Sequence, residues 1–215
     1  MSTIMQITES LKHYIDEQII PRYDHFDAAH RRDHAETVIT QSMLLAENYE
    51  VNVDMVYAIA AYHDTGLCED RKTHHLVSGR IVRLDEALRK WFGANEIETM
   101  AQAVEDHRAS SDHAPRSIYG MIVAEADRAI VPHNIVERTI QYGLSHYPEL
   151  DEAEQYERTL SHLKEKYGDG GYLKLWLPDS PHVARLEELR SIIRNDSRLR
   201  KLYDEIYESL KTKEA

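Results

Sequence analysis

The sequence of this protein predicts an all-α fold. Only 8 glycines and 6 prolines occur among its 215 residues, so few positions favour tight turns or strand breaks. Charged residues make up 30% of the chain and apolar residues 42%, a balance typical of amphipathic helices around a core. Apolar side chains also recur three and four residues apart, which is the helical period. We therefore expect a single-domain helical bundle with a helical extension at its C-terminus.

Each expected helix is defined by its apolar stripe and by the residues that stop it. The helices cover about residues 4–20, 34–49, 55–64, 74–92, 95–108, 117–130, 133–146, 151–167 and 182–212. Pro21 closes the first helix, and Gly66 is suited to the left-handed conformation just past the third. Gly93 ends the fourth, and Pro115 breaks the chain before the sixth.

The composition disfavours several classes of function. A formal net charge of −12 argues against general affinity for nucleic acids or anionic membranes, which reward clustered Lys and Arg. The single cysteine, Cys68, excludes a disulfide scaffold and favours a reducing compartment. The N-terminal segment lacks the pattern of a signal peptide, and no stretch approaches the ~20 apolar residues of a membrane span. We expect a soluble, cytoplasmic protein.

Several of the apolar stripes carry one side chain that can bind a metal ion. These residues are His34, His63 with Asp64, His75, His107 and Asp127. An isolated polar side chain in an apolar core costs on the order of 1–3 kcal/mol unless it finds a partner. Sharing one cation is therefore more favourable than leaving each group unpaired. The chain also holds 13 histidines, more than packing requires.

The donor set predicts which metals the site takes. Imidazole and carboxylate ligands together suit Mn, Fe, Co, Ni or Zn, whereas oxygen-only sites suit Mg or Ca. We expect one or two divalent transition-metal ions, with Mg as a further candidate. At the end of its helix, Asp64 can bridge two ions or hold a metal-bound water, while His63 binds one ion. His74, next to His75, is expected to point into solvent.

The order of these residues resembles a known family. His34 in "RRDHAETVI", the doublet in "AAYHDTG" and Asp127 in "AEADRA" are similar to the pattern of the HD superfamily of metal-dependent phosphohydrolases. The segments "HHLVSGRIV" and "AVEDHRA" look like the two extra-histidine helices of its dinuclear branch. The resemblance covers residues 22–132. It implies a helical HD core over this range, with flanking helices over residues 1–21 and 133–215 that pack on the core.

The resemblance also implies a set of ligands and a reaction. The implied ligands are His34, His63, Asp64 and Asp127 for the first metal, with His75 and His107 completing a second. The usual activity of the family is hydrolysis of phosphate esters, in which a metal-bound hydroxide attacks phosphorus. Asp64 is the catalytic candidate because it alone is placed to serve both metals and the nucleophilic water.

The expected substrate is a small phosphorylated metabolite, with a nucleotide as the leading candidate. Lys72 lies on the loop between Asp64 and His75, and we expect it to contact the substrate phosphate. Neither a nucleic-acid polymer nor a membrane is expected as a partner, and the sequence leaves the oligomeric state open.

Two other functions fit the same residues. Enzymes similar to myo-inositol oxygenase share the order of four histidines and two aspartates, so a mixed-valent di-iron oxygenase is an alternative to a hydrolase. A non-catalytic helical module that keeps a metal for stability is a second alternative. The identity of the metal and the behaviour of an Asp64 variant distinguish these functions.

Overall fold

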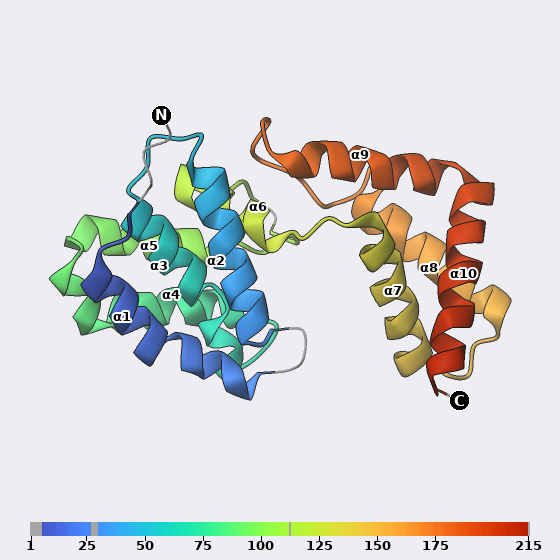
Figure 1. The fold of residues 1–215 in the computed structure, drawn as a ribbon, viewed down its shortest axis with the longest axis horizontal. Helices are drawn as coiled ribbons and strands as arrows, with labels where there is room; N and C mark the ends of the chain where they lie inside the picture. Colours follow the sequence, from blue (N-terminus) through green and yellow to red (C-terminus); the bar gives the residue numbers. More distant parts are fainter. Residues whose placement is uncertain (1–5, 27–29, 112, 215) are drawn as a thin grey trace. The chain divides into compact units, whose positions relative to one another are not determined.

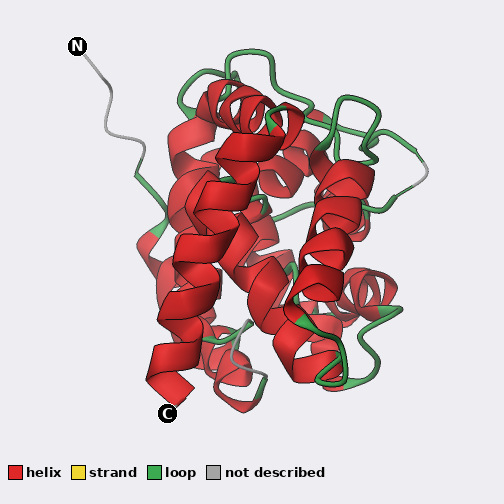
Figure 2. Ribbon diagram, turned by 90° about the vertical axis from the view of Figure 1, so that its right-hand side faces the viewer, coloured by secondary structure: helices red, strands yellow, loops and turns green. Residues whose placement is uncertain are grey.

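A computed structural model gives the architecture of residues 6–26, 30–111 and 113–214. Within these ranges every regular element is a helix, and no strand occurs (Figure 2). The all-α fold predicted by the sequence is therefore confirmed. The expected start of the first helix, at residue 4, lies outside the described residues.

The chain divides into two compact units, residues 1–128 and residues 129–215 (Figure 1). The helices of the first unit are α1 (Glu9–Gln18), η1 (Ile20–His25), α2 (Arg32–Ala46), α3 (Val53–Tyr62), η2 (Thr65–Cys68), α4 (His74–Leu84), η3 (Glu86–Lys90), α5 (Ala94–Glu105) and α6 (Ile118–Asp127). Those of the second unit are α7 (Pro132–His146), α8 (Glu152–Tyr167), α9 (Pro181–Arg194) and α10 (Asp196–Glu214). The second unit corresponds to the predicted C-terminal extension.

The division into compact units does not test the expected domain bounds, and the core expected over residues 22–132 stays a prediction. The first unit ends at residue 128, whereas the expected core ends at residue 132. The second unit has a core of its own, because it buries apolar side chains from each of its helices, including Ile140, Leu163, Leu189 and Tyr203. The packing of residues 133–215 on the first unit stays a prediction.

Helix α3 is the central element of the first unit. Every residue from Met55 to Tyr62 is buried, so this helix has no solvent face beyond its first two residues. It packs against α1, α2, α5 and α6. The Asn52 side chain caps its first turn by accepting the backbone N–H of Asp54 at 3.0 Å. The residues that follow the end of α3 are therefore held at the centre of the unit.

The helix expected over residues 74–92 is interrupted at Asp85. One carboxylate oxygen accepts the backbone N–H of Ala87 at 3.0 Å, which caps η3 in place of a continuing helix. The other accepts the hydroxyls of Tyr14 at 2.7 Å and Tyr62 at 2.5 Å. A short polar side chain that bonds to the nearby backbone competes with the helical ladder, which explains the break.

A similar break divides the helix expected over residues 182–212. The Asn195 side chain accepts the backbone N–H of Arg198 at 3.0 Å and so caps the start of α10.

Helix α8 begins as the sequence suggests, with a capping box in which Asp151 and Glu154 each accept the other's backbone N–H at 2.9 Å.

Gly66 follows α3 for a reason other than the one expected. It does not adopt a positive φ. A Cβ at this position would lie 2.1 Å from the carbonyl oxygen of His74 and 2.6 Å from the backbone nitrogen of Ser78. The glycine N–H also donates to the Ser78 hydroxyl at 2.8 Å. Gly66 is thus needed for the close approach of η2 to α4.

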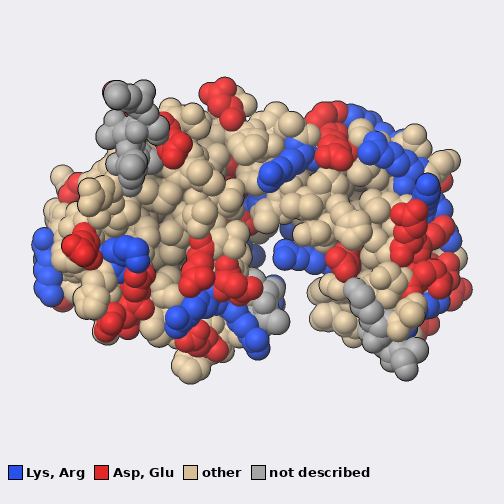
Figure 3. Space-filling model, in the orientation of Figure 1, with Lys and Arg blue, Asp and Glu red and all other residues tan. Residues whose placement is uncertain are grey.

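Surface charges of both signs are interspersed on the face of the molecule that Figure 3 shows. Many of them form ion pairs within one unit, such as Arg83 with Glu98 at 2.8 Å and Arg194 with Asp169 at 2.9 Å. None of the described helices is long and apolar enough to cross a membrane.

Candidate metal centre

The metal-capable residues that come together in the first unit lie at helix ends. His34 is in the first turn of α2, His63 directly follows α3, His74 begins α4, His107 follows α5 by two residues, and Asp127 ends α6. Their elements pack together, because α2 contacts α3 and α6, and α5 contacts α4 and α6. The packing of apolar helices thereby brings five helix ends to one place.

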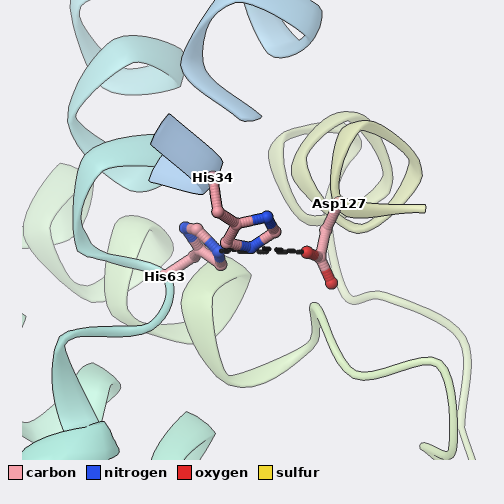
Figure 4. A group of neighbouring side chains, drawn as sticks. All are labelled: His34, His63 and Asp127. Atoms are coloured by element: carbon pink, nitrogen blue, oxygen red, sulfur yellow. Dashed lines mark hydrogen bonds and ion pairs between the residues drawn. The ribbon is translucent and has the colours of Figure 1, made fainter. Parts of the chain in front are cut away.

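Three of these side chains form a first trio, consisting of His34, His63 and Asp127 (Figure 4). The Nε2 atoms of His34 and His63 lie 3.2 Å apart. Asp127 Oδ1 lies 3.3 Å from the Nε2 atom of His34 and 3.9 Å from that of His63. The Oδ2 atom of Asp64 faces the same trio, 3.6 Å and 3.3 Å from the two histidine nitrogens.

A second trio consists of Asp64, His74 and His107. The other carboxylate oxygen of Asp64, Oδ1, lies 3.2 Å from His74 Nε2 and 3.4 Å from His107 Nε2. The two histidine nitrogens are 3.1 Å apart. Asp64 therefore presents one oxygen to each trio.

The protonation of three rings is fixed by the backbone. The Nδ1 atoms of His63, His74 and His107 each lie 2.6–2.7 Å from the carbonyl oxygen three residues earlier. A carbonyl can only accept a hydrogen bond, so each Nδ1 carries a proton, and in the neutral form of each ring the lone pair lies at Nε2. Such second contacts orient metal-binding histidines in proteins.

These distances fit a bound cation. In each trio the three ligand atoms lie within 4.8 Å of one another. Ligands about 2.0–2.2 Å from a common metal are separated by roughly 3.0–4.4 Å, depending on the coordination angle. The Nε2 lone pairs of His74 and His107 also repel each other at 3.1 Å unless a cation or a proton lies between them. The donor set therefore suits two divalent metals bridged by Asp64.

The pKa shifts of the centre also indicate a site that favours a positive charge. Burial disfavours protonated His34, but hydrogen bonds with Asp127 and Asp64 outweigh this and raise its pKa to about 10. Burial likewise opposes ionisation of Asp127, yet its bond with His34 lowers its pKa to about 2. The charge of His63 and bonds from His107 and His34 hold the pKa of Asp64 well below its usual range. Two ionised carboxylates thus face the histidine nitrogens, and a metal ion would displace the proton on His34.

The family assignment rests on a comparison with protein-family models, which matches residues 31–130 to the HD domain. Residues 31–130 are an HD domain. This match supports membership of the HD superfamily over the matched range, as the resemblance predicts. All residues of both trios lie within the matched range. No curated protein and no solved structure matches the chain.

The HD domain brings together most of the expected ligands. His34, His63, Asp64 and Asp127 converge as the sequence suggests, and His107 joins the second trio. The place expected for His75 is taken by His74, which was expected to point into solvent. Helix α4 begins at His74, and its buried residues Val77, Ser78 and Val82 follow three, four and eight residues later. Buried residues Ser78, Gly79 and Val82 follow His75 at three, four and seven positions, so the stripe alone does not distinguish His74 from His75.

His75 lies beside the HD centre without joining it. Its ring centroid is 5.6 Å from that of His74. Its Nδ1 atom is buried and has no hydrogen-bond partner among the described residues. Burial, together with the charge of Arg108, lowers the pKa of His75 to about 4. This histidine is therefore neutral and is not placed as a metal ligand.

Lys72 is held at the edge of the HD domain through its backbone. Its N–H donates to an Asp70 carboxylate oxygen at 3.0 Å, and its carbonyl accepts from the Arg108 guanidinium at 2.7 Å. The residue is exposed, and within the described structure no contact joins its ammonium group to either trio. A role in binding phosphate stays a prediction.

The HD domain fixes the end of α5 with an ion pair that the sequence does not predict. The carboxylate of Asp106, next to His107, is 1% exposed. It accepts the backbone N–H of Arg116 at 2.7 Å and its guanidinium at 2.8 Å. Arg116 thereby fastens the segment that follows His107 to the helix end.

Proposed function

We propose that this HD protein is a phosphohydrolase acting on a small phosphorylated metabolite, with nucleotides as the first class to test. The observation that supports the proposal is the arrangement of Asp64, whose two oxygens each face one trio of ligands. Two metals held this way lie close enough to act on one phosphoryl group.

Each residue of the two trios would bind one metal ion, except Asp64, which would bind both. His34, His63 and Asp127 would hold one ion, His74 and His107 the other, and Asp64 would bridge them. When bound, divalent metals supply an activated water at neutral pH and neutralise charge on phosphoryl oxygens. Two carboxylates and four neutral imidazoles balance only half the charge of two divalent ions, so the loaded centre attracts an anionic substrate.

The exposure of the ligands indicates the side from which a substrate enters. The side chains of His34 and Asp127 are 24% and 26% exposed, whereas those of His63 and Asp64 are 0% and 4% exposed. A substrate phosphate therefore reaches the centre past His34 and Asp127. The buried residues would hold the ions from the interior of the unit.

A phosphate-release assay tests the proposal. The metal-free protein is loaded separately with Mn, Co, Ni, Zn, Fe or Mg and incubated with nucleotides, cyclic nucleotides and sugar phosphates. We expect release of phosphate, or opening of a phosphodiester, for at least one class of substrate. Asp64→Asn should abolish it, since this variant cannot supply two anionic oxygens.

Two results would contradict the proposal. Protein that retains two irons and consumes substrate only with oxygen is an oxygenase of the kind similar to myo-inositol oxygenase. Protein that binds metal but turns over no phosphate compound, with Asp64→Asn changing only stability, is a metal-stabilised binding module. Metal analysis, oxygen consumption and unfolding measurements distinguish these results from hydrolysis.

A further inference from the structure

Tyr23 lies beside the HD doublet, formed by His63 and Asp64, although it is distant in sequence. It belongs to η1, and its side chain is 0% exposed. Its hydroxyl donates to the carbonyl oxygen of Ala61 at 2.9 Å and accepts the backbone N–H of Asp64 at 3.2 Å. One side-chain oxygen therefore joins the last turn of α3 to the bridging residue.

The end of α3 shows why such a contact is needed. In a continuing helix the N–H of Asp64 would bond to the carbonyl of Ala60. That carbonyl instead accepts the Nδ1 proton of His63 at 2.7 Å. The next two carbonyls also accept side chains, Ala61 from Tyr23 and Tyr62 from the Thr65 hydroxyl at 2.8 Å.

The backbone consequently leaves the helix between the two members of the doublet. His63 has helical angles, with φ −51° and ψ −40°, whereas Asp64 has φ −109° and ψ 7°. The change lets His63 remain on the helix face while Asp64 turns one oxygen toward each trio. The Asp64 N–H is the backbone group whose direction sets this turn, and Tyr23 holds it.

We propose that Tyr23 is a positioning residue for the two-metal centre. Its hydroxyl fixes the backbone of Asp64 so that the carboxylate bridges both trios. The inference rests on the proposed two-metal function. It predicts that removal of the hydroxyl weakens metal binding at both trios, because both share Asp64.

The matched control is a second buried tyrosine, Tyr62, which is the last residue of α3. Tyr62 is also 0% exposed, but its hydroxyl donates to Asp85 and not to the doublet. In Tyr62→Phe, Asp85 keeps the Tyr14 hydroxyl and the Ala87 N–H. Tyr23→Phe and Tyr62→Phe therefore each remove one buried hydroxyl and keep the ring, but only the first releases the doublet.

Two measurements on the full-length variants separate positioning from packing. In the metal-free protein, amide hydrogen exchange at Asp64 should accelerate at least about ten-fold in Tyr23→Phe and stay at the wild-type rate in Tyr62→Phe. In Co²⁺ titrations followed by visible absorption, Tyr23→Phe should bind about ten-fold or more weakly with altered ligand-field bands, within the 10–100-fold range that loss of an outer contact costs. Tyr62→Phe should bind like the wild type.

The outcomes are distinguishable from failure of the proposed function. Equal Co²⁺ affinity and equal Asp64 exchange in both variants would overturn the role of Tyr23. Wild-type protein that binds no Co²⁺ would overturn the two-metal centre, while the exchange measurement would still report on the contact. If Tyr23→Phe does not fold, amide hydrogen exchange of the wild-type protein tests the contact instead. An Asp64 amide that exchanges as fast as a solvent-exposed amide would rule out the hydrogen bond to Tyr23.

Discussion

The Nε2 atoms of His74 and His107 lie 3.1 Å apart, although both rings donate from Nδ1 to a backbone carbonyl. In their neutral forms the two rings would therefore present lone pairs to each other and could not share a hydrogen bond. Asp64 Oδ1 lies against both nitrogens. This convergence of three electron-pair donors is stable only with a cation or a proton among them.

Divalent metal should stabilise the protein through Asp64. At a free metal concentration about 100 times the dissociation constant, the free energy of unfolding should rise by about 2.7 kcal/mol. Thermal unfolding with and without metal measures this increase. Asp64→Asn should lose most of it, whereas Asp33→Asn, an exposed aspartate next to His34, should keep it. An equal increase in both variants would show that the metal binds elsewhere.

Replacement of His74 and of His75 should have different effects. His74→Ala removes a member of the second trio and should reduce the bound metal from two ions toward one. His75→Ala should leave metal content at the wild-type value, because His75 is not placed as a ligand. Metal analysis after dialysis measures both. Loss of metal in His75→Ala but not in His74→Ala would contradict the geometry described above.

Gly66→Ala should destabilise the protein by about 1–3 kcal/mol, the usual cost of overpacking. The added Cβ would meet the backbone of α4 at 2.1 Å, and backbone cannot move aside as a side-chain tip does. The control is Gly170→Ala, since nothing lies within 4 Å of a Cβ at that glycine. Denaturant unfolding should show a lower midpoint for the first variant alone.

Tyr14 should make stability decline at alkaline pH. Burial and the bond to Asp85 raise the pKa of Tyr14 to about 12 from its ordinary value of 10.0. The contribution of Tyr14 to the free energy of unfolding is therefore fully present below pH 10 and is lost as pH rises through about 12. Tyr14→Phe should be less stable than the wild type at neutral pH, and the difference should shrink above pH 12. Tyr172→Phe, at an exposed position, should follow the wild-type profile.

The sequence predicts most of the metal centre because its signal is local. An imidazole or carboxylate on an apolar helical stripe is conspicuous, and His34, His107 and Asp127 each stand out in this way. The structure places His74, and not the expected His75, beside Asp64 and His107. Both histidines lie in the first turn of α4, where two adjacent stripes fit the same residues.

Other features depend on contacts that periodicity does not contain. The breaks at Asp85 and Asn195 come from single side chains that bond to nearby backbone N–H groups. The contact of Tyr23 with the doublet joins residues 41 positions apart. Such a bond exists only after α3 and η1 have packed, so no local pattern in the sequence reports it.

The placement of every ligand at a helix end has a consequence for how this chain can change. The middle of each helix contributes apolar area and no ligand, so its residues can be exchanged for others of similar size without touching the centre. The loops that leave the ends can lengthen or shorten without altering the spacing between ligands. Variation that reshapes the entrance around His34 and Asp127 can therefore accumulate while the chemistry of the bridging carboxylate stays the same.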